Sequence, residues 1–136
     1  MKWNNIMKSI LTFFFLISCE AIATNCPFTY QSSELSDKII EAIRSSQNCE
    51  KASELAESCS FGSSLDVDIC EAAERKCGLN FWKKLSQDDK KIYNGLQRKC
   101  NIKYSKMVGT MYISMNAFCK LEIAKLYSQL YTPVLD

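Results

Sequence analysis

The 136-residue chain contains no histidine. Histidine is the commonest general base in enzymes and activates serine and cysteine nucleophiles, so its absence excludes Ser-His and Cys-His catalytic pairs. The closest carboxylate pairs, Asp66 with Asp68 and Asp88 with Asp89, lie in polar segments where such residues usually cap helices. The chain also lacks a glycine-rich phosphate loop and a calcium-binding loop. We therefore expect a protein that is not an enzyme and that uses no cofactor.

Glycine and proline are scarce, with four and two residues respectively. Few stretches alternate between apolar and polar residues with the period of two that is typical of strands. Apolar residues instead recur at helical spacing in five segments, which are 33–47, 49–59, 66–77, 86–107 and 110–131. The sequence therefore predicts an all-α fold, a small disulfide-stapled helical bundle that ends in a long antiparallel helical hairpin.

Single residues in this pattern predict where helices begin and end and which face of one helix is buried. Asp66 or Asp68 is expected to cap the third helix, and Gly78 is expected to end it. The inner face of the fourth helix is expected to carry Ile92, Leu96 and Cys100 and, less tightly spaced, Tyr104 and Met107. Gly109 is expected to separate the last two helices.

The N-terminus has the three parts of a secretory signal peptide. Lys2 and Lys8 make a positively charged region ahead of an apolar run over residues 10–17. Ala21 and Ala23 then place small residues at the two positions that signal peptidase recognises. The apolar run is too short to cross a membrane as a helix. Cleavage after Ala23 is expected to release residues 24–136 as a single cysteine-rich domain that is periplasmic or secreted.

A second processing route is open at Cys19. Residues 16–19, Leu-Ile-Ser-Cys, resemble a bacterial lipobox, in which the cysteine is lipidated and becomes the first residue of the mature chain. The protein would then be lipid-anchored to the bacterial envelope. No segment after residue 23 is apolar and long enough to span a bilayer. We therefore expect membrane attachment only through a lipidated Cys19.

Seven of the eight cysteines follow residue 23, and they are Cys26, Cys49, Cys59, Cys70, Cys77, Cys100 and Cys119. In an exported domain of this size, cysteines are expected to form disulfides. A four-thiolate zinc site is the alternative, but the chain has neither a C-x2-C pair nor a histidine, so we expect no metal. The odd number leaves one thiol over. Cys26 is the candidate because it lies outside the helical segments.

Helix geometry predicts one of the disulfide pairs. Gly109 lies nearly midway between Cys100 and Cys119, so a turn at Gly109 would bring these cysteines to equal height on facing helices. Cys70 and Cys77 are two turns apart in one helix, about 10 Å along its axis, and therefore cannot pair with each other. We expect each of them to reach a different element, with Cys49 and Cys59 as the available partners. The remaining connectivity stays open.

The formal net charge of +2 conceals a strong asymmetry. Residues 34–74 carry ten acidic and three basic side chains, net −7, whereas residues 75–125 carry twelve basic and three acidic side chains, net +9. Either the two halves pack together and neutralise each other, or one face attracts a charged macromolecular partner. The candidate partner-binding residues are Glu50, Glu54 and Glu57, which share one short helical segment; the alternative is a solvated face.

The basic half combines lysine and arginine residues with aromatic ones. In a cytosolic protein this combination indicates nucleic-acid binding. Because the chain is expected to be exported, we expect no nucleic-acid partner. A solvated helix face is the default interpretation, and anionic membrane or glycan surfaces come next.

Four short motifs stand out along residues 47–130. They are Cys49-x-Lys51-Ala52 with Glu57 and Cys59, Leu79-Asn80 with Trp82, Leu96-Gln97, and the segment from Gly109 to Cys119 continued by Leu121 and Leu126. Together they resemble the LprI-type lysozyme-inhibitor family of small exported bacterial proteins. The chain departs from that pattern in the spacing of Cys49 and Cys59, which is about two residues short, and in lacking a tryptophan after the glutamine.

The resemblance implies an exported protein that inhibits a cell-wall hydrolase by steric and electrostatic blocking. Many lysozymes are strongly basic, and an acidic helical surface would attract them. The expected partner is therefore a protein, either lysozyme or another basic wall hydrolase. Two other functions remain open, an envelope surface, adhesion or scaffold lipoprotein and an immunity protein against an exported toxin.

Overall fold

The computed structural model describes residues 25–29 and 34–132. Its helices are α2 (Leu35–Ser45), α3 (Cys49–Ser58), α4 (Leu65–Phe81), the 3-10 turn η1 (Trp82–Lys84), α5 (Gln87–Tyr104) and α6 (Thr110–Tyr131). The described part of the chain contains no strand, which confirms the predicted all-α bundle with its final helical hairpin. The predicted signal peptide, including Cys19, lies outside the described residues.

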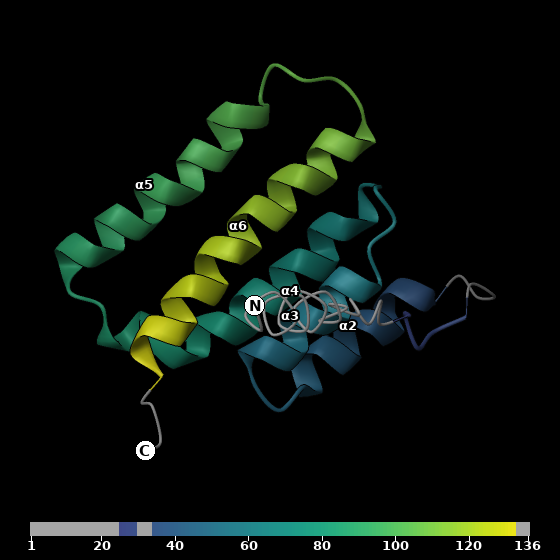
Figure 1. The fold of residues 1–136 in the computed structure, drawn as a ribbon, viewed down its shortest axis with the longest axis horizontal. Coiled ribbons are helices and arrows are strands. Elements are labelled where there is room, and N and C mark those ends of the chain that lie inside the picture. Colours follow the sequence, from purple (N-terminus) through teal and green to yellow (C-terminus); the bar gives the residue numbers. More distant parts are fainter. Residues whose placement is uncertain (1–24, 30–33, 133–136) are drawn as a thin grey trace, which may run out of the picture.

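Helix α6 is the centre of the bundle. It packs along α4 on one side and pairs with α5 as an antiparallel hairpin on the other, while α2 and α3 cover the far side of α4 (Figure 1). The core lies where these helices meet and includes the fully buried Ile39, Ile43, Ile69 and Leu121. Burying one such side chain stabilises a fold by about 1.5–3 kcal/mol. The shared core of α2, α4 and α6 therefore makes a large contribution to the stability of the bundle.

Gly78 does not end α4, and this prediction is wrong. The helix continues to Phe81, whose side chain is 1% exposed and packs against the rings of Tyr93 and Tyr127, with centroids 5.3 and 5.5 Å away. A glycine inside a helix costs about 1 kcal/mol relative to alanine. Burying a phenylalanine contributes about 1.5–3 kcal/mol, so tertiary packing outweighs the local preference to stop.

The predicted inner face of α5 is only partly right. Cys100 is buried, and Leu96 and Tyr104 are half-buried. Ile92 is 57% exposed, with the neighbouring Tyr93 buried instead, and Met107 is exposed beyond the end of α5. Residues 93, 97 and 100 follow a helical i, i+4, i+7 spacing, and this row is the one that faces α6 and α4. The first two positions of the face are thus one residue away from the expected ones, and Cys100 is common to both.

Asp66 does not cap α4 in the expected way, because Ser64 occupies the N-cap position. The Asp66 carboxylate is instead fully buried and accepts hydrogen bonds from the backbone N–H groups of Phe61, Gly62 and Ser63, at 2.9, 2.9 and 3.3 Å. The Ser114 hydroxyl of α6 donates a further hydrogen bond at 2.5 Å. One carboxylate therefore organises the loop before α4 and ties it to α6. Asp68 is exposed.

Three disulfides staple the described residues, Cys26–Cys59, Cys49–Cys77 and Cys100–Cys119. The Cys100–Cys119 pair is the predicted one, with a Cα–Cα distance of 5.8 Å across the hairpin. Cys77 reaches α3 through Cys49, again as expected.

The assignment of the unpaired cysteine is wrong. Cys26, the expected free thiol, bonds to Cys59, and Cys70, which was expected to form a disulfide, is free and buried. The irregular segment around Cys26 lies against the end of α3 and brings the two Cα atoms within 4.7 Å. Lying outside a helix therefore did not keep Cys26 from a partner, and its bond leaves Cys70 without one.

Disulfides persist in oxidising compartments and are rare in the cytosol. Three of them in one small domain indicate a protein of a non-cytoplasmic compartment, extracellular or periplasmic. Among the described helices, none combines the length and the apolar character that a membrane crossing requires.

Candidate functional site

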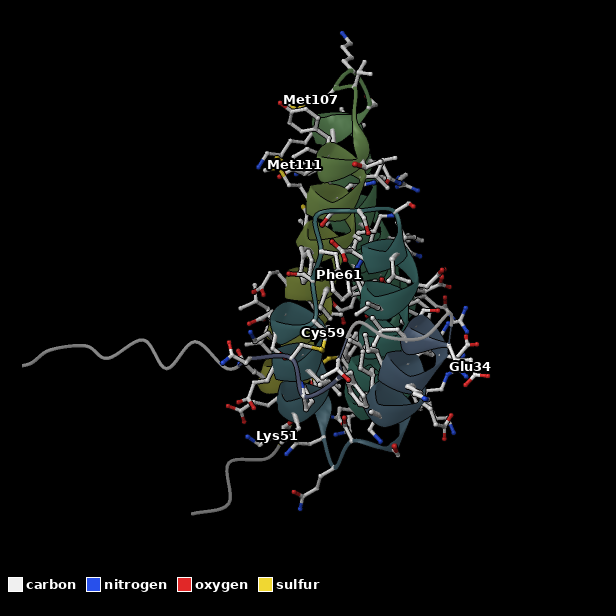
Figure 2. The ribbon with its side chains drawn as sticks, turned by 90° about the vertical axis from the view of Figure 1, so that its right-hand side faces the viewer. Glu34, Lys51, Cys59, Phe61, Met107 and Met111 are labelled. Carbon is white, nitrogen blue, oxygen red and sulfur yellow. A yellow bond between two sulfur atoms is a disulfide. The ribbon has the colours of Figure 1, made fainter. Side chains whose placement is uncertain are left out.

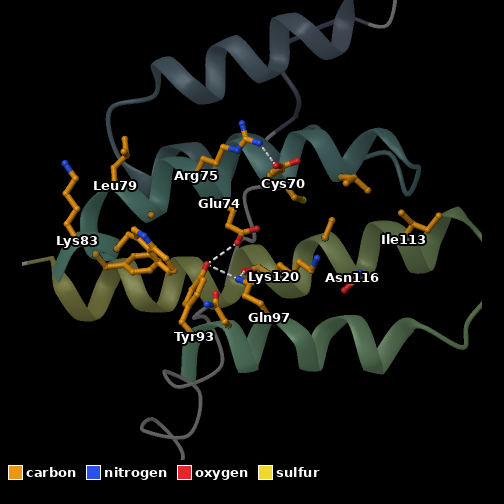
Figure 3. Close-up of a pocket in the computed structure, with 17 residues that line it drawn as sticks. Cys70, Glu74, Arg75, Leu79, Lys83, Tyr93, Gln97, Ile113, Asn116 and Lys120 are labelled. Carbon is orange, nitrogen blue, oxygen red and sulfur yellow. Dashed lines mark hydrogen bonds and ion pairs between the residues drawn. The ribbon is translucent and has the colours of Figure 1, made fainter. Parts of the chain in front are cut away.

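A groove of about 920 Å³ opens between three helices (Figure 3). Helix α6 forms its floor, and α4 and α5 form its walls. Its lining includes Val67, Leu79, Trp82 and Ile113, apolar side chains that are all partly exposed to solvent. This volume is in the range of small-molecule and side-chain binding sites, so the groove can accept apolar groups of a ligand or of another protein.

A hydrogen-bond network crosses the middle of the groove. The Tyr93 hydroxyl donates to Glu74 Oε1 at 3.1 Å, and Gln97 Nε2 donates to Tyr93 Oη at 2.9 Å and to the backbone oxygen of Lys120 at 3.1 Å (Figure 3). Burial raises the pKa of Glu74, although the hydrogen bond from Tyr93 opposes this shift. Burial and the nearby Glu74 also raise the pKa of Tyr93, so its hydroxyl remains a donor at neutral pH. The network joins α4, α5 and α6 at the level of the groove.

Four aromatic rings form one end of the groove region. Tyr93 contacts Phe81, Trp82 and Tyr127, with ring centroids 5.3, 5.8 and 5.0 Å apart. The Lys90 ammonium lies 5.5 Å from the centre of the Trp82 ring. Such tilted and edge-to-face contacts fix the orientation of each ring, so Trp82 is held at the groove edge although it is partly exposed.

Replacing Glu74 with glutamine is expected to stabilise the protein at pH 7. A carboxyl group whose pKa is raised by folding binds its proton more tightly in the folded chain, so its ionised form weakens the fold at higher pH. Glutamine removes that charge and still accepts the Tyr93 hydrogen bond. Because Glu74 is only partly buried, we expect a gain of about 0.5 kcal/mol, about 2 °C in Tm. Thermal unfolding should show this gain at pH 7 and its disappearance near pH 4, where unfolded glutamate is protonated.

Cys70 lines the groove wall as a buried thiol. Burial, reinforced by the negative charges of Asp66, Glu74 and Glu57, raises the pKa of Cys70 to about 12. The thiolate is the reactive form, so a shift of this size makes alkylation about 1000-fold slower at a given pH. We therefore do not assign Cys70 a nucleophilic role.

Thiol titration of a folded protein of residues 24–136 should show no fast-reacting thiol, and one thiol after denaturation without reductant. Three or more thiols after denaturation would contradict the three disulfides. Fast labelling of the native protein would contradict the burial of Cys70.

The predicted partner-binding glutamates lie on α3. Glu50 and Glu57 are exposed and Glu54 is half-buried. Glu54 pairs with Lys51 of its own helix at 2.7 Å, and Glu57 pairs with Lys125 of α6 at 2.9 Å. Glu57 therefore helps to hold α3 against α6, which sequence spacing did not indicate.

The acidic and basic halves do not neutralise each other across the described interfaces. Among the described residues, Glu57–Lys125 is the only ion pair that joins residues far apart in the sequence; the other five ion pairs join residues three or four positions apart. Of the ten acidic residues of the 34–74 half, only Asp66 is buried, and only Glu54 and Glu74 are half-buried. The charge asymmetry of the sequence is therefore a property of the protein surface.

The groove was missed by the sequence reasoning, although some of its residues were noted. Leu79 and Gln97 were singled out through the family resemblance, and Trp82 also as an aromatic residue beside the basic residues; the structure brings all three to the groove. The bond between Tyr93 and Glu74 joins residues on different helices, and no sequence signal indicated it. The described residues contain no group of potential ligands that could hold a metal ion.

Comparisons of the chain with protein-family models, with curated proteins and with solved structures find no match. The resemblance to the LprI-type family therefore rests on the short motifs alone.

Proposed function

We propose that the chain is an exported binding protein that inhibits a basic cell-wall hydrolase, such as lysozyme, by steric and electrostatic blocking. The observation that carries this proposal is the exposed acidic surface of α2, α3 and the start of α4, which the basic half leaves almost unneutralised. Export is proposed to follow from the signal peptide of residues 1–23. The protein has no catalytic role in this proposal, and it uses no cofactor or metal.

Electrostatic attraction favours a basic partner. A surface of one sign speeds the encounter with a partner of opposite sign, and salt weakens the effect because the Debye length is about 8 Å at physiological ionic strength. Glu50 is exposed and makes no ion pair with any described residue, so it can meet a partner without breaking an internal contact. Glu54 and Glu57 contribute to the same negative potential while paired. The acidic surface is therefore proposed to set the association rate.

The groove is proposed to supply the apolar anchor of the complex. Binding energy in protein interfaces is concentrated in a few apolar and aromatic contacts, whereas exposed charges act mainly on the association rate. Leu79 and Trp82 stand at the groove edge and are exposed. Truncating both to alanine is therefore expected to speed dissociation and to leave association nearly unchanged.

The test measures inhibition and association rate with a basic lysozyme and the oxidised protein of residues 24–136. We expect Glu50→Lys with Glu54→Lys to slow association about ten-fold, with a smaller change in dissociation. Glu57 is kept, because its loss would remove the Lys125 ion pair and confuse binding with stability. Wild-type association should also slow as salt rises.

A matched control reverses two acids of the basic half, Asp88→Lys with Glu122→Lys. Each of the two pairs of substitutions changes the net charge equally. The α3 variant removes one ion pair between residues three positions apart, Lys51–Glu54, and the control removes two, Asp88–Lys91 and Glu122–Lys125. Loss of local ion pairs therefore cannot explain slower association of the α3 variant alone. The control should slow association much less.

Two results would contradict the proposal. Equal slowing by both variants would assign the effect to net charge rather than to the α3 surface. If lysozymes of several classes keep full activity in the presence of the oxidised protein at micromolar concentration, the protein is not an inhibitor. An envelope scaffold would then be the better account of its function.

A further inference from the structure

The turn between α5 and α6 carries an exposed apolar cluster. Val108 is 92% and Ile102 72% exposed, and Met107 and Met111 are also exposed. Figure 2 shows Met107 and Met111 at the end of the hairpin, far from Glu34 and Lys51. The cluster is part of a structured turn, since Met107 N–H donates to the backbone oxygen of Tyr104 at 3.0 Å and the Cys100–Cys119 disulfide closes the hairpin below it.

Along the sequence on both sides of this turn, the charged residues have one sign only. Residues 90–121 contain seven lysines and arginines and no aspartate or glutamate. Lys103 and Lys106 flank the apolar cluster and are exposed. We call Ile102, Met107, Val108 and Met111, together with Lys103 and Lys106, the tip patch. It combines apolar side chains at the apex with lysines beside them.

We propose that the tip patch docks the protein onto an anionic phospholipid surface. The apolar side chains of the apex enter the headgroup region, and the lysines contact lipid phosphates. Lysine suits this position because its stem is apolar while its ammonium group stays at the interface. This inference is independent of the proposed inhibitor function. It adds a membrane contact to the chain that does not need lipidation of Cys19.

The composition of the tip patch favours a lipid surface over an anionic glycan. A glycan offers charge and hydroxyl groups, which lysines alone would satisfy. It gives no reason to expose several large apolar side chains at one end of the hairpin, and exposed apolar patches on soluble proteins mark interaction sites. A bilayer interface satisfies both kinds of side chain at once.

The position of the patch fits the rest of the molecule. Along the length of the molecule in Figure 2, the tip lies at one end, and Glu34 and Lys51 of α3 lie toward the other. Docking by the tip therefore keeps the exposed acidic residues of α2 and α3 away from the negative lipid headgroups, whereas docking by the body would bring like charges together. The start of α4 lies nearer the tip, because Asp66 contacts Ser114 near the start of α6. The hairpin thus sets an orientation in which the acidic residues of α2 and α3 are directed away from the membrane.

The test is cosedimentation of the oxidised protein with large vesicles of two compositions. We expect binding to equimolar phosphatidylcholine and phosphatidylglycerol, little binding to phosphatidylcholine alone, and a loss of binding as salt rises. Lys103→Gln with Lys106→Gln should lower partitioning about 30-fold, because each lysine at an anionic surface contributes about five-fold. Met107→Ser, Val108→Ser and Met111→Ser together should lower it more than about ten-fold.

Two control variants make the same kinds of substitution, apolar residue to serine and lysine to glutamine, at positions away from the tip. Leu126→Ser with Leu130→Ser removes exposed apolar side chains near the C-terminal end of α6, and Lys38→Gln with Lys51→Gln removes exposed lysines of α2 and α3. Both should bind the anionic vesicles like the wild type. In Val108→Trp, the new indole should shift its emission to the blue when anionic vesicles are added, as expected for entry into the interface.

Three outcomes would overturn the proposal. If the serine variant binds anionic vesicles as well as the wild type does, or if soluble dextran sulfate binds equally and competes fully, the patch is a polyanion site. If sedimentation without lipid shows a dimer that the serine variant abolishes, the patch joins two copies of the chain. No binding of the wild-type protein to anionic vesicles at low salt would remove the membrane contact.

Discussion

Asp66→Ala is expected to destabilise the protein by about 3–5 kcal/mol, the range found when one partner of a buried charged network is removed. The carboxylate accepts hydrogen bonds from three backbone N–H groups and from Ser114, so its loss leaves several donors unsatisfied at once. Domains of this kind are stable by about 5–15 kcal/mol in total. Urea unfolding should therefore show a large fall in the midpoint, with an unchanged slope.

Three further variants separate the causes. Asp66→Asn should be nearly as harmful, because its NH2 group would face donors where an acceptor is needed. Ser114→Ala removes a single hydrogen bond and should cost about 1–2 kcal/mol. Asp68→Ala, two residues away and exposed in the same first turn, should cost less than about 1 kcal/mol. Equal effects at Asp66 and Asp68 would show that charge at the start of α4, and not the buried network, is responsible.

Replacing Cys49 and Cys77 together with alanine is expected to lower the free energy of unfolding by about 3–4 kcal/mol. The bond joins residues 28 positions apart, and the chain-entropy model gives this value for a loop of that length. Both residues are buried where α3 packs on α4, so the substitution also removes packed sulfur atoms. Unfolding in urea under oxidising conditions measures the loss.

The Cys100→Ala and Cys119→Ala pair is the informative comparison. The same model predicts about 3 kcal/mol for its shorter loop of 19 residues. This bond, however, closes a hairpin of which α5 packs mainly on α6. Hydrogen exchange should therefore quicken mainly in the distal turns of α5 and α6, whereas loss of Cys49–Cys77 should quicken exchange in α2, α3 and α4 as well. Identical exchange patterns for the two variants would contradict this division.

The helices could be predicted because their core positions recur along the sequence. Every long helix expected from apolar spacing is present, and the Cys100–Cys119 bond followed from the near symmetry of these residues about Gly109. Helix ends were less accurate. The propensity of Gly78 to end a helix is local, whereas the burial of Phe81 that extends α4 depends on helices that come later in the chain.

The candidate site was harder to predict than the fold. Ile92 and Tyr93 are neighbours, and hydrophobicity alone favours burial of the isoleucine. Tyr93 is buried instead because its hydroxyl finds Glu74 on another helix, a contact that sequence spacing cannot show. The groove likewise arises from the way α4, α5 and α6 diverge, not from a motif. The charge asymmetry was visible in the sequence. Whether the acidic residues stay exposed and unpaired with the basic half depended on which ion pairs form, and these the sequence did not show.

The burial of Cys70 has a consequence for how the correct disulfides are reached. Six cysteines can pair in 15 ways, and the choice of which of seven stays out multiplies that number by seven. Wrong pairs are corrected by thiolate exchange, and the leftover cysteine is itself an internal catalyst of such exchange while the chain is open. When α4 packs, Cys70 is buried and its pKa rises to about 12. Its thiolate is then scarce and shielded from solvent, so Cys70 no longer promotes exchange. Folding thus ends its own disulfide rearrangement once the native core has closed.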